Sequence, residues 1–245
     1  MTPRRLDPIL LTVAVLAVWQ GLALVAGPEI VASPAATIVH AAALLEKWSF
    51  WQAAAETGRA FALASLISVA GGLVLGLWLG LSRFAGDVAD PILGSLYSIP
   101  KITLYPLILL IFGLGLSAKV AFGVIHGILP IAIFGMNAVR GVAPIYLKTA
   151  RMMRMSKVST AMTIFAPAAL PEIVAGIRVG VALTLLGTLI GELFAATTGI
   201  GFALMRATDV HDVADILALT LLLFLFAALI NGLLHYGERR MRHER

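Results

Sequence analysis

The residues best placed to do chemistry in this sequence are a few ionisable side chains inside long apolar runs. Lys101, Arg178 and Glu192 each interrupt such a run. Even on lenient scales, a Lys or Arg at the centre of a membrane helix costs about 2.5–3.5 kcal/mol, so charged groups there face protein, water or a partner charge. We therefore treat these residues as candidates for moving ions or solutes.

Lys101 lies in the proline-containing segment SIPKITLYP. The prolines at 100 and 106 each remove a backbone donor, which predicts a broken or bent helix at membrane depth. Two interpretations stay open. Lys101 and Tyr105, with Glu192, line a solute path that tolerates anions, or Lys101 snorkels or pairs with a carboxylate such as Glu192.

Signatures of catalysis and metal binding are weak. Ser98 and Lys101 have the Ser-x-x-Lys spacing of some acyl-transfer enzymes, which makes a membrane-embedded enzyme our third hypothesis. The histidines do not have the helical spacing of metal ligands, so no metal site is predicted. Because the sequence has no P-loop, we expect neither ATP nor Mg²⁺ to bind this chain, and we predict no catalytic residue.

A basic, methionine-rich segment follows the middle of the chain. Five cationic side chains lie between Arg140 and Lys157. Residues 146–165 contain no Gly or Pro, which predicts a helix, and on that helix Lys148, Arg151 and Met155 would share one side. Methionines give adaptable apolar contacts. The segment is therefore suited to anionic lipid or to a groove in a soluble partner protein.

The elements that position these residues are membrane helices. Apolar residues make up 60% of the chain, charged residues 13%, and the mean hydropathy is +0.98. A span needs about 20 apolar residues. The apolar runs at 8–28, 60–82, 91–118, 120–139, 173–196 and 216–237 thus predict an all-α integral membrane protein with about six transmembrane helices, forming one domain over residues 1–245.

Lysines and arginines predict the orientation of these helices, because cations concentrate in cytoplasmic loops. The expected cytoplasmic cations are Arg4, Arg5, Arg83, the five in the basic segment, Arg239, Arg240, Arg242 and Arg245. The expected outer cations are Lys47, Arg59, Lys119 and Arg206. Both termini and the large loop at 140–170 are then cytoplasmic. Residues 30–58 read as an outer amphipathic helix, and 197–215 as an outer loop with a short helix.

Small residues recur at every fourth position of the second predicted span. They are Ala60, Ala64, Ser68, Gly72, Gly76 and Gly80. Inside lipid, such a face lets another helix backbone approach closely. We predict packing within the chain here, in preference to a seam between two copies.

Several segments together resemble one protein family. LKTARMMRMSKVSTAMTIFAPAALPEIVAGIRVG is similar to the EAA loop of ABC importer permeases, and ASPAATIV, IPKITLYPLILLIFGLG and GELFAATTGIGFAL resemble permeases for nitrate, taurine and alkanesulfonates. The resemblance implies a type I importer permease of the bacterial inner membrane, a non-catalytic subunit that forms the path for a small solute. The alternative is a secondary transporter or channel with Lys101 and Glu192 in an ion or proton relay.

The resemblance also implies partners. A periplasmic or extracellular binding protein would deliver the solute, two permease chains would pair as a homodimer or a heterodimer, and cytoplasmic ATPase subunits would hold ATP and Mg²⁺. A coupling helix between the fourth and fifth spans would contact the ATPase. The implied contact residues are Lys148, Thr149, Ala150, Arg151, Arg154, Met155, Ser156, Leu170 and Pro171.

Some of these residues depart from the family pattern. Ala150, Ser156 and the Leu170–Pro171 pair match it, and Thr149 replaces an Ala. Lys148 stands where Glu is usual, which reverses the charge of that contact. Arg154 stands where Gly is usual, and loss of a residue that tolerates positive φ is expected to straighten or redirect the helix.

Overall fold

The computed structural model describes residues 7–243, and every regular element in that range is helical. The elements are α1 (Asp7–Ala26), α2 (Pro34–Leu45), α3 (Trp48–Leu81), α4 (Arg83–Ser98), η1 (Lys101–Leu104), α5 (Tyr105–Phe112), α6 (Leu116–Arg140), α7 (Pro144–Met152), α8 (Lys157–Thr160), η2 (Ala161–Phe165), α9 (Ala166–Ala195), α10 (Ile200–Asp209) and α11 (Val213–His243). The all-α prediction is confirmed. Arg4, Arg5 and Arg245, which entered the predicted orientation, lie outside the described residues.

Within residues 7–243, α1, α3, α6, α11 and the helix ending at Ala195 are long and apolar enough to cross a membrane. A sixth span forms if α4 and the η1–α5 segment are taken as one broken pair, bent by 87°. The break falls beside Pro100, as the sequence predicts. Starting this span at residue 91 was wrong, because the Ser82 hydroxyl accepts the amide of Ala85 and begins α4 earlier.

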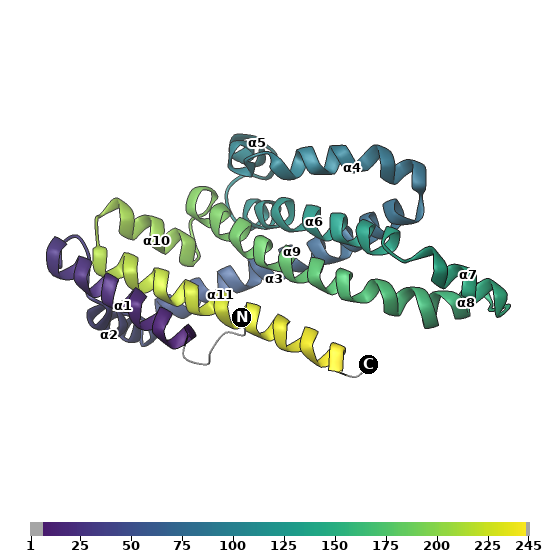
Figure 1. Cartoon of the computed structure of the whole chain (residues 1–245). Helices are drawn as coiled ribbons and strands as arrows, with labels where there is room; N and C mark the ends of the chain where they lie inside the picture. The colour runs from purple at the N-terminus through teal and green to yellow at the C-terminus, as the bar shows by residue number, and fades with distance from the viewer. Residues whose placement is uncertain (1–6, 244–245) are drawn as a thin grey trace. The chain divides into compact units, whose positions relative to one another are not determined.

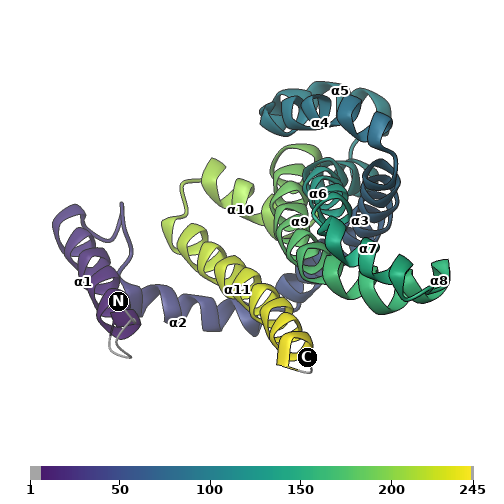
Figure 2. The same ribbon diagram turned by 45° about the vertical axis from the view of Figure 1, so that its right-hand side comes forward.

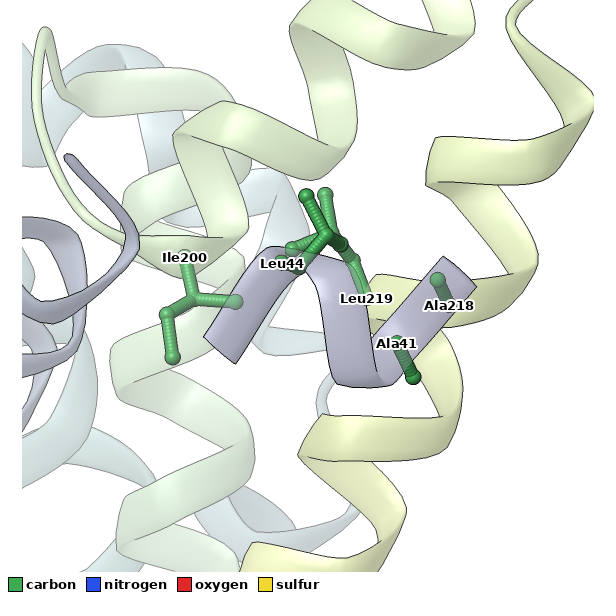
Figure 3. Packing of buried hydrophobic residues seen from close by; sticks show 5 residues of the cluster. All are labelled: Ala41, Leu44, Ile200, Ala218 and Leu219. Atoms are coloured by element: carbon green, nitrogen blue, oxygen red, sulfur yellow. The ribbon is translucent and has the colours of Figure 1, made fainter. Parts of the chain in front are cut away.

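The described chain divides into two compact units, and the first comprises residues 1–56 and 198–226. Figure 3 shows its apolar cluster, formed by Ala41 and Leu44 of α2, Ile200 of α10, and Ala218 and Leu219 of α11. His40 Nε2 lies 2.6 Å from Asp215 Oδ1 and joins α2 to the first turn of α11. The predicted segment 30–58 holds α2 and the beginning of α3, and α10 is the short helix expected within 197–215.

The second unit comprises residues 57–197 and 227–245, and α3, α6 and α9 lie side by side in it (Figures 1 and 2). The predicted packing residues Ser68, Gly72, Gly76 and Gly80 are buried in α3. A Cβ on Gly72 would lie 2.7 Å from Ile131 Cβ, and one on Gly76 would collide with the carbonyl oxygen of Ala132. The missing side chains therefore let α3 approach α6 within the same chain.

The same device joins α6 to α9. A Cβ on Gly191 would lie 2.9 Å from the Cα of Lys119, and one on Gly180 would collide with the side chain of Ile131. Inside lipid, helices associate through close van der Waals contact, and glycine faces allow it. The three helices therefore form the scaffold on which the candidate site residues are placed.

Candidate functional site

The basic segment is not the single helix predicted over 146–165. α7 ends at Met152, α8 is a separate turn, and the π-helical η2 leads into α9. Arg154 has a φ of 52°, which ends α7. Its amide donates to the carbonyl of Arg151 at 3.0 Å, and the amide of Met155 donates to that of Ala150 at 3.0 Å. These two bonds form a Schellman motif, which satisfies carbonyls at the end of the helix.

Arg154 itself adopts the backbone conformation that glycine usually takes. The expectation that losing Gly would straighten the helix was wrong. A left-handed conformation costs an L residue about 1–2 kcal/mol. The two hydrogen bonds of the Schellman motif offset that cost, so the turn is retained with an arginine at its centre.

α7 exposes a surface that is both apolar and cationic. Met152 and Met153 are 85% and 68% exposed, and Lys148 and Arg151 are exposed beside them. Ala150 is buried, which sets the opposite face of α7 against the protein. Because Met155 lies beyond the turn, the prediction that it shares one helix face with Lys148 and Arg151 was wrong.

The rest of the predicted coupling residues surround the same turn or begin α9. The Ser156 hydroxyl accepts the amide of Ser159 at 3.1 Å and starts α8. Leu170 is half-buried and Pro171 exposed near the start of α9. Ala169 packs with Ala138 and Val142, so the start of α9 docks against the end of α6. The structure thus brings the two parts of the predicted coupling site to the same end of α6.

Lys101 and Tyr105 lie at the break in the third span. Lys101 Nζ donates to the carbonyl of Tyr97 at 3.0 Å and lies 4.9 Å from the centre of its ring. Tyr105 Oη donates to the carbonyl of Phe194 at 2.5 Å, and its ring stacks on Phe122 with centroids 6.1 Å apart. Tyr105 therefore links the η1–α5 segment to α6 and α9.

Glu192 is not the partner of Lys101. Its Oε1 lies 3.4 Å from the Nζ of Lys119, and the two side chains are 0% and 1% exposed. Thr57 of α3 donates its hydroxyl toward both carboxylate oxygens, at 2.9 and 2.8 Å. Lys119, predicted among the outer cations, is buried in the protein, and a carboxylate on α9 compensates its charge; its side of the membrane stays a prediction.

Sequence reasoning missed Thr57 and Lys119, although a signal for the lysine was present. Lys119 is the single charged residue between the uncharged stretches 102–118 and 120–139. A lone charge between two apolar runs is typical of an ionisable side chain that lies within the membrane-spanning part of a protein, and Lys101 is in the same situation. Arg178 is the other cation inside a predicted span. Its Nη1 lies 3.2 Å from the Nδ1 of His235 on α11.

Comparison with known proteins places the chain in a family. Residues 72–243 match the model of the family described as "Binding-protein-dependent transport system inner membrane component". The chain belongs to this family. The match covers the broken span, the basic segment and the glycine-packed helices α6 and α9.

Curated relatives support the assignment. A putative aliphatic sulfonates transport permease protein, SsuC of Bacillus subtilis, is 25% identical over 236 residues, covering 95% of this chain and 85% of the relative. The taurine transport system permease protein TauC of Escherichia coli is 27% identical over 193 residues, covering 79% and 70%. The nitrate import permease protein NrtB of Leptolyngbya laminosa is 26% identical over 192 residues, covering 78% and 68%.

A solved structure supports the fold. An inward-facing form of the MetNI methionine ABC transporter superposes with a TM-score of 0.64 at 18% identity, covering 78% of this chain and 96% of that one. With the family assignment, this chain is a multi-pass transmembrane permease subunit of a binding-protein-dependent ABC importer, and it forms the path for a small solute. The alternative of a secondary transporter or channel is not favoured.

Proposed function

We propose that α7 and the turn at Arg154 are the surface on which the cytoplasmic ATPase subunit docks. The observation that carries this proposal is the pair of exposed methionines, Met152 and Met153, at the tip of a cationic helix. Methionine adapts its shape to a partner's groove. The Schellman motif holds this tip in a defined position, so force applied there passes to α6 and α9 instead of fraying α7.

The charges of this surface specify the partner's chemistry. Lys148 and Arg154 stand where the family pattern has Glu and Gly, and both are exposed. A cationic rim binds an acidic surface and is repelled by a basic one. We therefore expect the ATPase paired with this chain to carry carboxylates around its docking cleft.

The orientation follows from the same contact. With α7 toward the ATPase, the α6–α9 connection and both termini are cytoplasmic, as the distribution of Lys and Arg predicts. The permease pairs with a second copy of the same chain around the solute path. Purification of an intact complex that contains two different permease chains would contradict the homodimer.

Cross-linking tests the docking surface directly, because the chain has no cysteine. A single cysteine at Met153 is expected to cross-link to a co-expressed ATPase in the intact complex. Leu110→Cys on α5 is the matched control, since Leu110 is also strongly exposed. Absence of cross-links from every position between 148 and 157 in a transporting complex would disprove the docking surface.

Labelling from one side of the membrane tests the orientation. In cells that express the chain without the ATPase, which would cover Met153, a membrane-impermeant maleimide is expected to react with Lys47→Cys and not with Met153→Cys until the membrane is opened. The reverse pattern would contradict the predicted topology. Both residues are exposed in the chain, so a difference in labelling reports the side of the membrane and not burial.

Charge reversal tests the acidic partner surface. Lys148→Glu is expected to weaken assembly with the ATPase about tenfold, because it places like charges at the contact. Lys47→Glu, also an exposed lysine, is the control and should leave assembly unchanged. Unchanged assembly of the Lys148 variant would exclude a contact between Lys148 and carboxylates of the ATPase.

A further inference from the structure

We propose that Lys119, Glu192 and Thr57 form a buried anchor that positions the η1–α5 segment, with Tyr105, for solute transport. These three residues come from α6, α9 and α3, and each is at most 1% exposed. Because solvent and solute do not reach them, they act through the residues that they hold. The anchor is therefore a set of positioning residues and not part of the wall of the path.

The two charges are poorly placed within their own helices. Lys119 lies in the first turn of α6, where the helix dipole is positive, and Glu192 lies in the last turn of α9, where it is negative. Each charge is favourable only at the end of the other helix. These two ends meet, since the amide of Gly115 donates to the carbonyl of Ala195 at 2.9 Å. The ion pair therefore stabilises this one arrangement of α6 and α9.

The last turn of α9 connects the anchor to α5. Glu192 binds Lys119, the carbonyl of Phe194 accepts the Tyr105 hydroxyl, and the carbonyl of Ala195 accepts the Gly115 amide. Ile108 of α5 packs into a cluster that includes Ala195. A displacement of the last turn of α9 thus changes the contacts that tie α5 to α9, including the Tyr105 hydrogen bond.

Thr57 extends the anchor to the third helix of the scaffold. Its hydroxyl donates to the carboxylate, which leaves Glu192 bonded from both α3 and α6. A carboxylate held from two sides can neither rotate nor leave the pair without losing hydrogen bonds in a dry environment. The inference rests on the permease function and does not depend on the ATPase contact proposed above.

Spin labelling of the full-length chain in liposomes tests the anchor, since the chain has no cysteine. A nitroxide at Leu110→Cys reports the mobility of α5, and one at Phe84→Cys reports α4 as the internal control. Lys119→Met and Glu192→Gln are each expected to raise the mobility of the label on α5 and leave the label on α4 unchanged. The exchanged pair, Lys119→Glu with Glu192→Lys, is expected to restore the original mobility.

The assembled complex supplies a functional measurement. Binding-protein-stimulated ATP hydrolysis is expected to fall about threefold to thirtyfold in each single variant, the range typical of mutations along a coupled network. The exchanged pair should recover part of the loss. Asp87→Asn, which removes an exposed ion pair of the same unit, should leave both the label mobility on α5 and the hydrolysis unchanged.

Two outcomes would overturn the proposal. One is unchanged mobility on α5 in both single variants, and the other is equal loosening at both labels, which indicates a general loss of packing. If neither single variant folds, Thr57→Val gives the same comparison with both charges in place. That variant should loosen α5 alone and by less, and wild-type mobility would equally contradict the anchor.

Discussion

α6 has an ion pair near each end, and the two pairs are built differently. Near its start, Lys119 Nζ lies 3.4 Å from Glu192 Oε1, with both side chains at most 1% exposed. At its last residue, Arg140 Nη2 lies 2.9 Å from Asp87 Oδ1, with the side chains 29% and 73% exposed. The exposed pair is the shorter one, although only the buried pair would leave a charge shielded from water if one partner were removed.

Burial explains this difference. Water and salt screen an exposed pair, whose contribution to stability is about 0–1 kcal/mol. Arg140 also suits the negative end of its own helix and donates to the carbonyl of Arg83 at 3.0 Å. Lys119 has the opposite position, at a positive helix end and inside the protein. Distance between charges is therefore a poor guide to which pair matters.

Removing one member of the buried pair is expected to give the largest change in stability. Lys119→Met leaves the carboxylate of Glu192 buried without its cation and is expected to lower the free energy of unfolding by about 3–5 kcal/mol. Thermal unfolding of the purified chain in detergent measures this change.

The control for that prediction removes both charges. Lys119→Met with Glu192→Met leaves no lone charge, so its stability should lie within about 1–2 kcal/mol of the wild type. A double variant as unstable as the single one would show that the lysine contributes mainly by packing.

The glycine face between the ends of α6 is the next test. Gly76→Ala places a Cβ against the backbone of α6 and is expected to destabilise the protein by about 1–3 kcal/mol. Gly94→Ala in α4 is the control, since no atom lies within 4 Å of its new Cβ. It should be neutral or stabilising by up to about 1 kcal/mol. Equal effects of the two substitutions on thermal unfolding would show that close packing of α3 on α6 is not needed.

The turn that follows the C-terminal end of α6 and α7 gives a smaller effect of opposite sign. Arg154→Gly relieves the strain of the left-handed backbone, but glycine also loses more conformational entropy on folding. The net effect is expected to stabilise the turn by about 0.5–1 kcal/mol. Amide hydrogen exchange of Met155 measures it. His211 has a φ of 58° at the end of α10 and a matching pair of hydrogen bonds, so His211→Gly is a matched control that should slow exchange of the Asp212 amide similarly.

The exposed pair should show the smallest change. Asp87→Asn is expected to alter the free energy of unfolding by at most about 1 kcal/mol, and less at high salt, where the charges are screened. Unfolding measured at two salt concentrations tests this. If Asp87→Asn instead lowered the free energy of unfolding as much as Lys119→Met does, independently of salt, the two ion pairs would not differ as described.

The spans and the break between α4 and η1 were predictable because both depend on local chemistry. The apolar runs indicate where the chain can cross a membrane, and Pro100 removes the donor that a continuous helix would need. The packing face of α3 was equally readable, since Gly72, Gly76 and Gly80 recur at helical spacing. What could not be read was the partner helix, because spacing within one helix does not identify the surface that covers it.

The buried pair and the turn at Arg154 were missed for a different reason. The charge of Lys119 is compensated by Glu192, which lies on a helix distant in sequence. The local sequence pattern therefore showed the charge but not its burial or its partner. At Arg154, residue type argued against positive φ, yet hydrogen bonds from the amides of Arg154 and Met155 stabilise the turn. In both cases a contact made elsewhere in the fold overrides a local preference.

The separation of Lys119 and Glu192 along the chain also bears on how the protein is made. At about 5–20 residues per second, the ribosome exposes Glu192 several seconds after Lys119. During that interval α6 carries a charge whose carboxylate partner has not yet been synthesised, and burying such a charge alone is unfavourable. The ion pair between α6 and α9 therefore cannot form until the end of α9 has been synthesised.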